Sequence, residues 1–498
     1  MTDELFGNPG TTPILPGFTP DPSICRVGED YFIANSSMEY SPAVPIWHST
    51  DLTRWELIGN ALCGEGQAPS GYVTGSRGIY APTLRHHDGV FYLLTTNVYE
   101  KSSGQIVFVT EDPSGPWRKI ADFETLTGID PDIAWDSDGR CYLSYCAWDE
   151  TTAGIKQAVV SLADGSVLEE AQWIWHGSGL SNPEGPHLFR RGKWWYLVIA
   201  EGGTERGHVI SVARSISPRG PFEGAPHNPI FTHRSTSHLV QNVGHADLVE
   251  CADGSWVAVY LGVRLMGQTP RYHANGRETF ISAITWVDDW PVFTAFPDFV
   301  SRGERQISEI FGSGPRLNPR WVSPGIEPNK FVTIDGCGAH VTAVTSPSGE
   351  PSGLFTRLPD LYWNARVTID CGNATGRFML RLDSRHWYGL RFSDGRVDAI
   401  SRVGDIESTV ASYGLNDETS TFSISTSPSK RGGLDEVVMS VVTEGRNIEL
   451  ASLDGRYITT EVAGGFTGRL VGVVIDSGEA CIRQIEIKAI DITWPMRG

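Results

Sequence analysis

Acidic and imidazole side chains return at one place in a repeated pattern of this sequence. Five stretches share a short turn, a strand with an apolar residue near its start, a tight hairpin and an apolar, aromatic second strand. We define the ring position as the residue three places before that first apolar residue; its occupants, in order, are Asp21, Ala81, Asp130, Gly185 and His245. In the fourth stretch Glu184 stands one residue earlier. Turn formation explains an Asp before Pro, but not why ionisable groups collect at one position of a repeat.

Three carboxylates brought together are suited to acid–base chemistry. In a cleft of low dielectric constant they shift one another's proton affinity, so that one stays protonated while another is ionised near neutral pH. Cleavage of a glycosidic bond needs an acid to protonate the leaving oxygen and a second carboxylate that activates water or acts as the nucleophile. Groups that face each other across a channel favour the wider spacing of roughly 6.5–9.5 Å, which inverts the anomeric centre.

These side chains converge only if the repeats surround one axis. The first apolar residues follow one another at spacings of 60, 49, 55 and 60 residues, enough for one four-stranded antiparallel sheet per repeat. Asp-Gly and similar hairpin tips support the strand assignment. We therefore predict an all-β protein in which residues 1–305 form a five-bladed β-propeller, with the ring positions at the mouth of its channel.

The second part of the chain has a different pattern. Residues 306–329 are rich in Pro, Gly and Ser, which predicts a linker. Residues 330–498 show short alternating strands with regular turn signals, which predicts a C-terminal β-sandwich of the lectin-like jelly-roll type. The sandwich either binds carbohydrate or walls off one end of the cleft, and we favour the second role. Its aromatic side chains are expected mainly in its core; they include Tyr362, Trp363, Trp387 and Tyr388.

The amino-acid composition limits the classes of molecule that this protein is expected to bind. The 498-residue chain has 59 acidic and 40 basic residues and a formal net charge of −19, which disfavours binding to nucleic acid or an anionic membrane. Its first residues lack a basic and an apolar signal region, and no segment approaches roughly eighteen consecutive apolar residues, so we expect a cytoplasmic protein. The eight cysteines include no CxxC pair and are expected to be reduced thiols rather than zinc ligands. Homo-oligomerisation is left open.

Five motifs, in this order, resemble those of glycoside hydrolase family 43, the five-bladed exo-acting β-xylosidases and α-L-arabinofuranosidases. They lie between Pro13 and Phe293 and read "FTPDPS", "GIDPDIAW", "NPEGPH", "VGHADL" and "NGRETF". The resemblance implies an inverting, exo-acting glycosidase that releases terminal α-L-arabinofuranose or β-D-xylose from hemicellulose-derived oligosaccharides. It leaves the choice between the two sugars open.

Residue by residue, the resemblance implies a role for each motif. Asp21 would be the general base that activates water, and Glu184 the general acid. Asp130 would orient the acid and raise its pKa, as expected for like charges. Arg277 would reach the sugar hydroxyls. His245 matches an axial histidine that faces a central cation in many relatives.

Two further aromatic residues are candidates for sugar binding. Tyr80 stands where many relatives have Trp, so that it would stack on the substrate with a smaller ring. Tyr40 lies in a segment that often lines the pocket.

Calcium prefers oxygen ligands, so a structural calcium ion in the channel, reached from His245 through water, is left open, and no other cofactor is expected. Three acids near Asp130 are expected to be solvated turn residues that point away from the site: Asp132, Asp136 and Asp138.

Two rival functions keep the same fold. A retaining fructan hydrolase would be expected to begin with an Asn-Asp-Pro-Asn-Gly type motif, and "TPDPSI" lacks the flanking Asn and the Gly. A sugar-binding propeller without catalysis would need only hydrogen bonds from its acids. The presence of all three carboxylates argues against that second rival.

Overall fold

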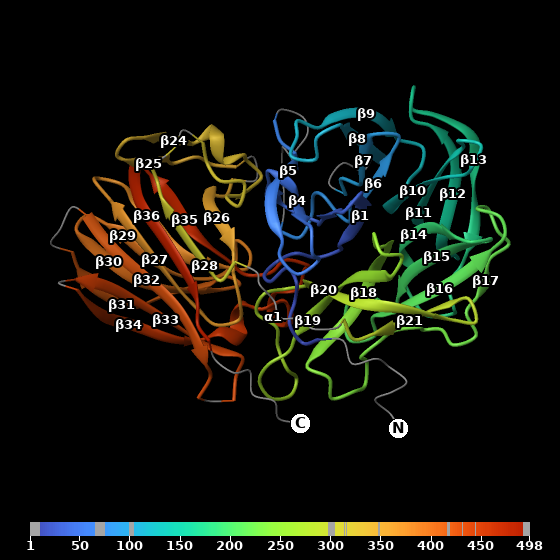
Figure 1. The fold of residues 1–498 in the computed structure, drawn as a ribbon. Helices are drawn as coiled ribbons and strands as arrows, with labels where there is room; N and C mark the ends of the chain where they lie inside the picture. Colours follow the sequence, from blue (N-terminus) through green and yellow to red (C-terminus); the bar gives the residue numbers. More distant parts are fainter. Residues whose placement is uncertain are drawn as a thin grey trace.

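The computed structural model describes residues 10–491, apart from 65–74, 99–103, 297–303, 313, 315, 347–348, 416–418, 431 and 444. Strands account for nearly all of its regular structure, which confirms the all-β prediction. Helical structure in these ranges is limited to η1 (Pro328–Lys330), η2 (Gly455–Ile458) and α1 (Thr460–Ala463). No helix among the described residues is long and apolar enough to cross a membrane. Figure 1 shows two lobes, one in blue to yellow-green and one in gold to red.

The first lobe consists of five consecutive four-stranded antiparallel sheets, one for each predicted repeat (Figure 1). Strand order within each sheet follows the chain, as the hairpin signals indicate. The first two sheets contain β1 (Ser23–Val27), β2 (Asp30–Ala34), β4 (Ala43–Ser49) and β5 (Glu56–Leu62), then β6 (Thr83–His87), β7 (Val90–Thr95), β8 (Gln105–Thr110) and β9 (Arg118–Phe123). The third contains β10 (Ile129–Trp135), β11 (Cys141–Trp148), β12 (Ala153–Ser161) and β13 (Ser166–Trp175). The last two contain β14 (Glu184–Arg191), β15 (Trp194–Glu201), β16 (Val209–Ser215) and β17 (Glu223–Gly224), then β18 (Val240–Glu250), β19 (Trp256–Arg264), β20 (Glu278–Val287) and β21 (Trp290–Thr294).

The first strand of each sheet lies against the first strand of its neighbours. Strand β1 contacts both β6 and β18, while β10 contacts β6 and β14, and β14 contacts β18. The segment before β1 reaches the fifth sheet, because the N–H of Ile14 donates to the carbonyl of Thr279 in β20 at 2.9 Å. These first strands carry the ring positions near their starts, so the sheets bring the candidate residues toward one region.

The second lobe has two antiparallel sheets. One contains β22 (Gln306–Ile310), β24 (Val332–Asp335), β25 (Gly338–Thr342), β27 (Trp363–Asp370), β32 (Thr419–Pro428), β33 (Asp435–Thr443), β34 (Arg446–Asp454) and β36 (Glu479–Ala489). The other contains β26 (Gly353–Arg357), β28 (Thr375–Arg381), β29 (His386–Ser393), β30 (Arg396–Val403), β31 (Ile406–Gly414) and β35 (Leu470–Ser477). Their facing residues form one buried apolar cluster, to which Phe422 and Phe378 contribute from opposite sheets. Burial alternates along β27, as expected for a strand with one face toward a core.

The segment predicted as a linker, residues 306–329, is tied to both lobes. Within it, β22 pairs with β36, and β23 (Ser323–Pro324) pairs with β3 (Tyr40–Ser41). The lobes also meet directly, since Arg264 forms a 2.7 Å ion pair with Asp360. Domain boundaries at 305 and 330 stay a prediction.

Candidate active site

The ring position has an unusual backbone in four of the five sheets. Asp21, Asp130, Gly185 and His245 have φ values of 51°, 57°, 59° and 48°. Few residues other than Gly adopt this left-handed conformation, and Asp and His are among those that tolerate it. The pairing register shifts at this point in the third, fourth and fifth sheets. Such irregularities redirect side chains at sheet ends, so the repeat supplies a local reason for the convergence.

Gly185 explains why the acid of the fourth sheet stands one residue earlier. A Cβ on Gly185 would lie 2.9 Å from Cδ2 of the His245 ring, which fills that space. The ring position in this sheet therefore requires Gly, and the carboxylate comes from Glu184 at the start of β14.

Asp21 is buried and paired with cationic and hydroxyl donors. Arg277 Nη1 lies 2.7 Å from its Oδ1, and the hydroxyl of Ser36 donates to its Oδ2 at 2.5 Å. His245 Nδ1 lies 3.6 Å from Oδ1. Burial alone would raise the pKa of Asp21, but Arg277, His245 and Ser36 outweigh it and hold the pKa below its usual value of 3.8. Asp21 is therefore ionised at neutral pH.

The pKa values of Glu184 and Asp130 are shifted in the opposite direction, above their usual values. Burial, reinforced by the negative charge of Asp21, raises the pKa of Glu184 from 4.5 to about 7. Burial and the nearby charge of Glu184 raise the pKa of Asp130 well above 3.8. Oδ2 of Asp130 accepts a hydrogen bond from the N–H of Gly185 at 3.1 Å, which anchors the residue that follows Glu184. The charges of the three carboxyl groups thus act on one another, and the pKa of Asp21 is shifted in the direction opposite to those of Glu184 and Asp130.

His208 faces Glu184 and was missed by the sequence analysis. Its Nε2 lies 4.0 Å from Oε1 of Glu184, and its Nδ1 lies 2.9 Å from the carbonyl of Asn242, which requires the proton on Nδ1. Burial lowers the pKa of His208 to about 4, so the ring is neutral and presents an acceptor to Glu184. The sequence signals His208 only indirectly, through Gly244. A Cβ on Gly244 would lie 2.2 Å from Cε1 of His208, so glycine leaves room for the imidazole ring.

The second lobe supplies one wall of the site. Phe466, which follows α1, has its ring centroid 5.7 Å from the guanidinium carbon of Arg277 and 6.2 Å from the ring centroid of Tyr80. Nη2 of Arg277 also donates to the carbonyl of Phe466 at 3.4 Å. The Phe466 side chain is 39% exposed, and with Arg277 and Thr204 it lines a cavity of about 570 Å³. No pattern in the sequence distinguishes Phe466, because only the docking of the lobes places it here.

Tyr40 does not line this site, contrary to the sequence prediction. The side chain has no exposed surface, and its hydroxyl accepts a hydrogen bond from Arg381 of the second lobe. It packs with Phe18 and Trp387 where the lobes meet. Tyr80, in contrast, is half-buried beside Phe466, and its hydroxyl donates to the carbonyl of Ser76 at 3.1 Å.

A buried ion-pair cluster lies where the first strands of the five sheets meet. The guanidinium of Arg85, from β6, contacts one residue from each of the other four sheets: Ser23 Oγ at 3.2 Å, Asp132 Oδ1 at 2.7 Å, His187 Nδ1 at 2.9 Å and Asp247 Oδ2 at 2.7 Å. The prediction that Asp132 is a solvated turn residue is wrong, because this side chain is fully buried. It belongs to the strand, whereas Asp136 and Asp138 lie in the following turn as expected, with Asp136 accepting backbone hydrogen bonds.

The residues near His245 do not fit a calcium ion. The carboxylates of Asp132 and Asp247 are already bound to the guanidinium of Arg85, and calcium prefers several free oxygen ligands. His245 is buried, which lowers its pKa to about 3, and its ring centroid lies 6.1 Å from that of His187. Within the described ranges, no three His, Cys, Asp or Glu residues are arranged to hold a metal.

Comparison with known sequences places these features in a family. The model of glycosyl hydrolases family 43 matches residues 10–291, more than half of the chain. A "Xylosidase/arabinosidase" of Butyrivibrio fibrisolvens is 43% identical over 296 residues, which cover 56% of this chain and 55% of that protein. A non-reducing end alpha-L-arabinofuranosidase of Bacteroides ovatus is 32% identical over 532 residues, which cover 99% of this chain and 95% of that protein. The chain thus spans about half of the first relative and nearly all of the second.

Solved structures show the same similarity across both lobes. A Bacteroides ovatus protein described as xyloglucan PUL GH43B superposes with a TM-score of 0.85 at 29% identity, covering 96% of this chain and 99% of that one. The xylan beta-1,4-xylosidase of Bacillus halodurans C-125 superposes with a TM-score of 0.84 at 25% identity, covering 96% and 99%. The similarity therefore extends beyond the part that the family model matches.

Proposed function

Because the chain belongs to glycosyl hydrolase family 43, we propose that it is an exo-acting, inverting glycosidase that releases terminal α-L-arabinofuranose or β-D-xylose from hemicellulose-derived oligosaccharides. The single observation that carries the proposal is the opposite shift in pKa of two neighbouring carboxyl groups. Asp21 is held ionised while Glu184 is held protonated up to about pH 7. A base and an acid are thereby available together, as hydrolysis of a glycosidic bond requires.

In the proposed reaction Asp21 accepts a proton from the water that attacks the anomeric carbon, and Glu184 donates its proton to the leaving oxygen. Asp130 anchors Gly185, the residue after Glu184, and the charges of Glu184 and Asp21 favour its own protonated form. His208 keeps its unprotonated Nε2 toward Glu184, 4.0 Å from Oε1, so that it adds no positive charge beside the acid. Arg277 holds Asp21 in place and presents its guanidinium edge to the sugar hydroxyls.

The architecture that we propose for the first lobe is a closed five-bladed propeller. The contact of β1 with β18, and the bond from Ile14 to Thr279, support closure between the first and last sheets. The second lobe is proposed to be a lectin-like sandwich that makes the site a pocket. Phe466 at the pocket wall supports cleavage at chain ends, because a wall on one side leaves room for a terminal sugar but blocks a polymer from passing through.

The experiment compares aryl β-D-xyloside with aryl α-L-arabinofuranoside as substrates of the full chain. Proton NMR of the first sugar released then reports its anomeric configuration before mutarotation. We expect turnover of at least one substrate, with the released sugar inverted at the anomeric carbon. Release of the retained anomer would contradict the mechanism, and absence of turnover on both substrates would favour a sugar-binding protein without catalysis.

A further inference from the structure

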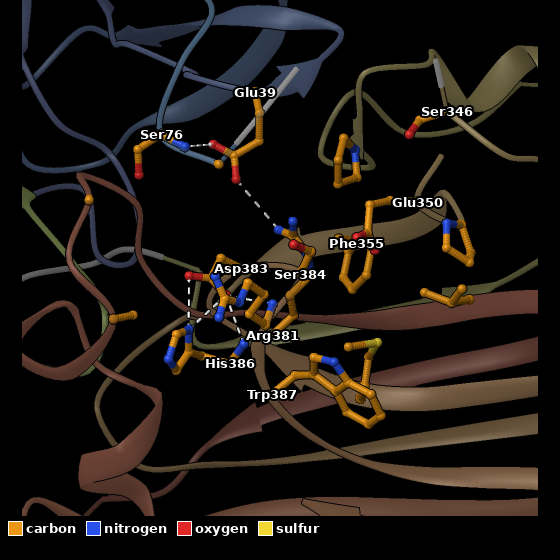
Figure 2. A pocket seen from close by; sticks show the side chains of 18 of the residues that line it. Glu39, Ser76, Ser346, Glu350, Phe355, Arg381, Asp383, Ser384, His386 and Trp387 are labelled. Carbon is orange, nitrogen blue, oxygen red and sulfur yellow. Dashed lines mark hydrogen bonds and ion pairs between the residues drawn. The ribbon is translucent and has the colours of Figure 1, made fainter. Parts of the chain in front are cut away.

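A second cavity lies between the lobes, apart from the acid–base residues. It has a volume of about 530 Å³, within the range of small-molecule binding sites. Its lining comes from both lobes, with Glu39 and Ser76 from the first and Phe355, Arg381 and Asp383 from the second. Figure 2 shows these side chains on different sides of the same space. Gly464 and Gly465 line both this cavity and the one beside Arg277 and Phe466, so the two cavities are neighbours.

Glu39 places a buried, incompletely satisfied acceptor at this cavity. The residue is 1% exposed, and its Oε2 accepts from the N–H of Ser76 at 2.8 Å. Its Oε1 has no hydrogen bond to any described residue, and the nearest cationic nitrogen, Nη1 of Arg381, lies 3.6 Å away. Buried carboxylate oxygens are rarely left in this state, because the lost hydration is not replaced. A ligand hydroxyl in the cavity would supply the missing hydrogen bond.

The opposite side of the cavity is a hydrogen-bonded polar turn. Oδ1 of Asp383 accepts from the backbone N–H groups of Arg385 and His386 at 2.8 and 2.7 Å, and it lies 3.0 Å from Nδ1 of His386. Figure 2 shows Asp383 and His386 joined by these bonds, with Ser384 next to them. The turn therefore presents carboxylate and hydroxyl groups without needing to reorganise.

The lining combines side chains of both signs of charge. Acidic and basic residues are equally represented, by Glu39, Glu350 and Asp383 and by Arg377, Arg381 and Arg385. Such a lining favours neither an anion nor a cation, but carboxylates and guanidinium groups both bind hydroxyls. Phe355, Met379, Trp387 and Val474 lie behind this polar lining and are at most 2% exposed. A neutral polyhydroxylated ring matches a lining of this kind.

We propose that this cavity is a second saccharide-binding site, which holds one sugar unit of a neutral oligosaccharide and performs no hydrolysis. Ser76 separates it from the proposed active site. On one side the N–H of Ser76 binds Glu39; on the other its hydroxyl accepts from the N–H of Phe466 at 2.7 Å and its carbonyl accepts from Tyr80. The two sites are neighbours with one shared wall. Only the choice of probe sugar rests on the proposed function.

The test counts binding sites for xylotriose by equilibrium dialysis. The background is the full chain with Glu184→Gln, which slows hydrolysis of xylotriose by roughly 10²–10⁴-fold while keeping the side-chain shape. Ser384→Trp is added to fill the second cavity, with Ser384→Ala as the matched control that leaves it open. Glu350→Trp, at an exposed residue of the rim, is a second blocking variant in case Ser384→Trp does not fold, and thermal melting checks each protein.

We expect two equivalents of xylotriose on the Glu184→Gln protein and on its Ser384→Ala derivative, and one equivalent on a folded blocking variant. A single equivalent that resists both blocking substitutions would overturn the proposal, as would two equivalents on a blocked protein. If the second cavity bound sulfate instead of xylotriose, it would be an anion site, and the proposal of a saccharide site would be overturned. Failure of the proposed function is detected separately, by absence of aryl pentoside turnover in the wild-type chain.

Discussion

Arg277 Nη1 lies 2.7 Å from Oδ1 of Asp21, and this ion pair separates the protonation state of Asp21 from that of Glu184. The guanidinium favours the charged form of Asp21, while the resulting negative charge disfavours ionisation of Glu184. Arg277 itself lowers the pKa of Glu184, and burial together with the charge of Asp21 outweighs that effect.

The leaving group should distinguish the two carboxyl roles. We expect Glu184→Ala to lower kcat on xylobiose or arabinobiose by roughly 10²–10⁴-fold, the usual value of a general acid. On a dinitrophenyl pentoside the loss should be much smaller, because that leaving group needs no proton. Asp21→Ala should lower kcat by a similar factor on both types of substrate, because the attacking water needs the base in both reactions. Equal losses for Glu184→Ala on both substrates would contradict the acid assignment.

The pH dependence should follow the two shifted pKa values. The active form needs Glu184 protonated and Asp21 ionised, so kcat/KM should fall as the pH rises through about 7, where Glu184 loses its proton. On the acidic side the loss should lie below pH 3.8, because the pKa of Asp21 is lowered. Initial rates at low substrate concentration between pH 4 and 9 measure the alkaline limb. With a dinitrophenyl pentoside, Glu184→Gln should lack that limb; a variant that keeps it would assign the titration to another group.

Phe466 should contribute to catalysis from the second lobe. We expect Phe466→Ala to lower kcat/KM about 10-fold, equivalent to ~1.4 kcal/mol, because the aromatic contact with Arg277 and the pocket wall are lost. Val462→Ala is the matched control in the preceding helix, at a side chain that is 42% exposed. Equal kinetics for the two variants would place Phe466 outside the site.

Arg85 should contribute far more to the free energy of unfolding than an exposed arginine does. Arg85→Leu leaves Asp132 and Asp247 buried without a cation, which typically costs about 3–5 kcal/mol in free energy of unfolding. Arg140→Leu is the control, because its pair with Glu169 is nearly half exposed on both sides and such pairs contribute about 0–1 kcal/mol. Urea unfolding measures both. Similar midpoints for the two variants would show that Arg85 does not hold the five sheets together.

Removal of divalent cations should leave the protein unchanged. The reason is that Arg85 already neutralises the carboxylates on which a calcium ion would depend. We expect the same kcat and the same melting temperature after exhaustive dialysis against EDTA, measured beside a sample returned to 1 mM calcium, a concentration far above typical affinities of intracellular sites. If activity fell on dialysis and returned with calcium, a structural calcium ion near His245, which the sequence left open, would be supported.

Local patterns in the sequence were sufficient for the repeat and its ring position. Strand and turn formation depend on neighbouring residues, so the five hairpin pairs and the place of Asp21, Asp130 and Glu184 within them could be predicted from spacing. Gly185 also fits this pattern once its backbone is considered, because glycine adopts a positive φ at no steric cost. The family resemblance rests on the same motifs, which is why it covers mainly the first lobe.

Only the tertiary structure decided what surrounds these residues. Tyr40 and Asp132 were assigned wrongly because burial depends on residues from other parts of the chain, such as Arg381 for Tyr40 and Arg85 for Asp132. His208 and Phe466 lack a position in the repeat and reach the site through long-range packing. The different protonation states of Asp21 and Glu184 also arise there, since desolvation and charge act through space. The chain order thus determines which side chains point toward a common centre, whereas their contacts determine what each can do chemically.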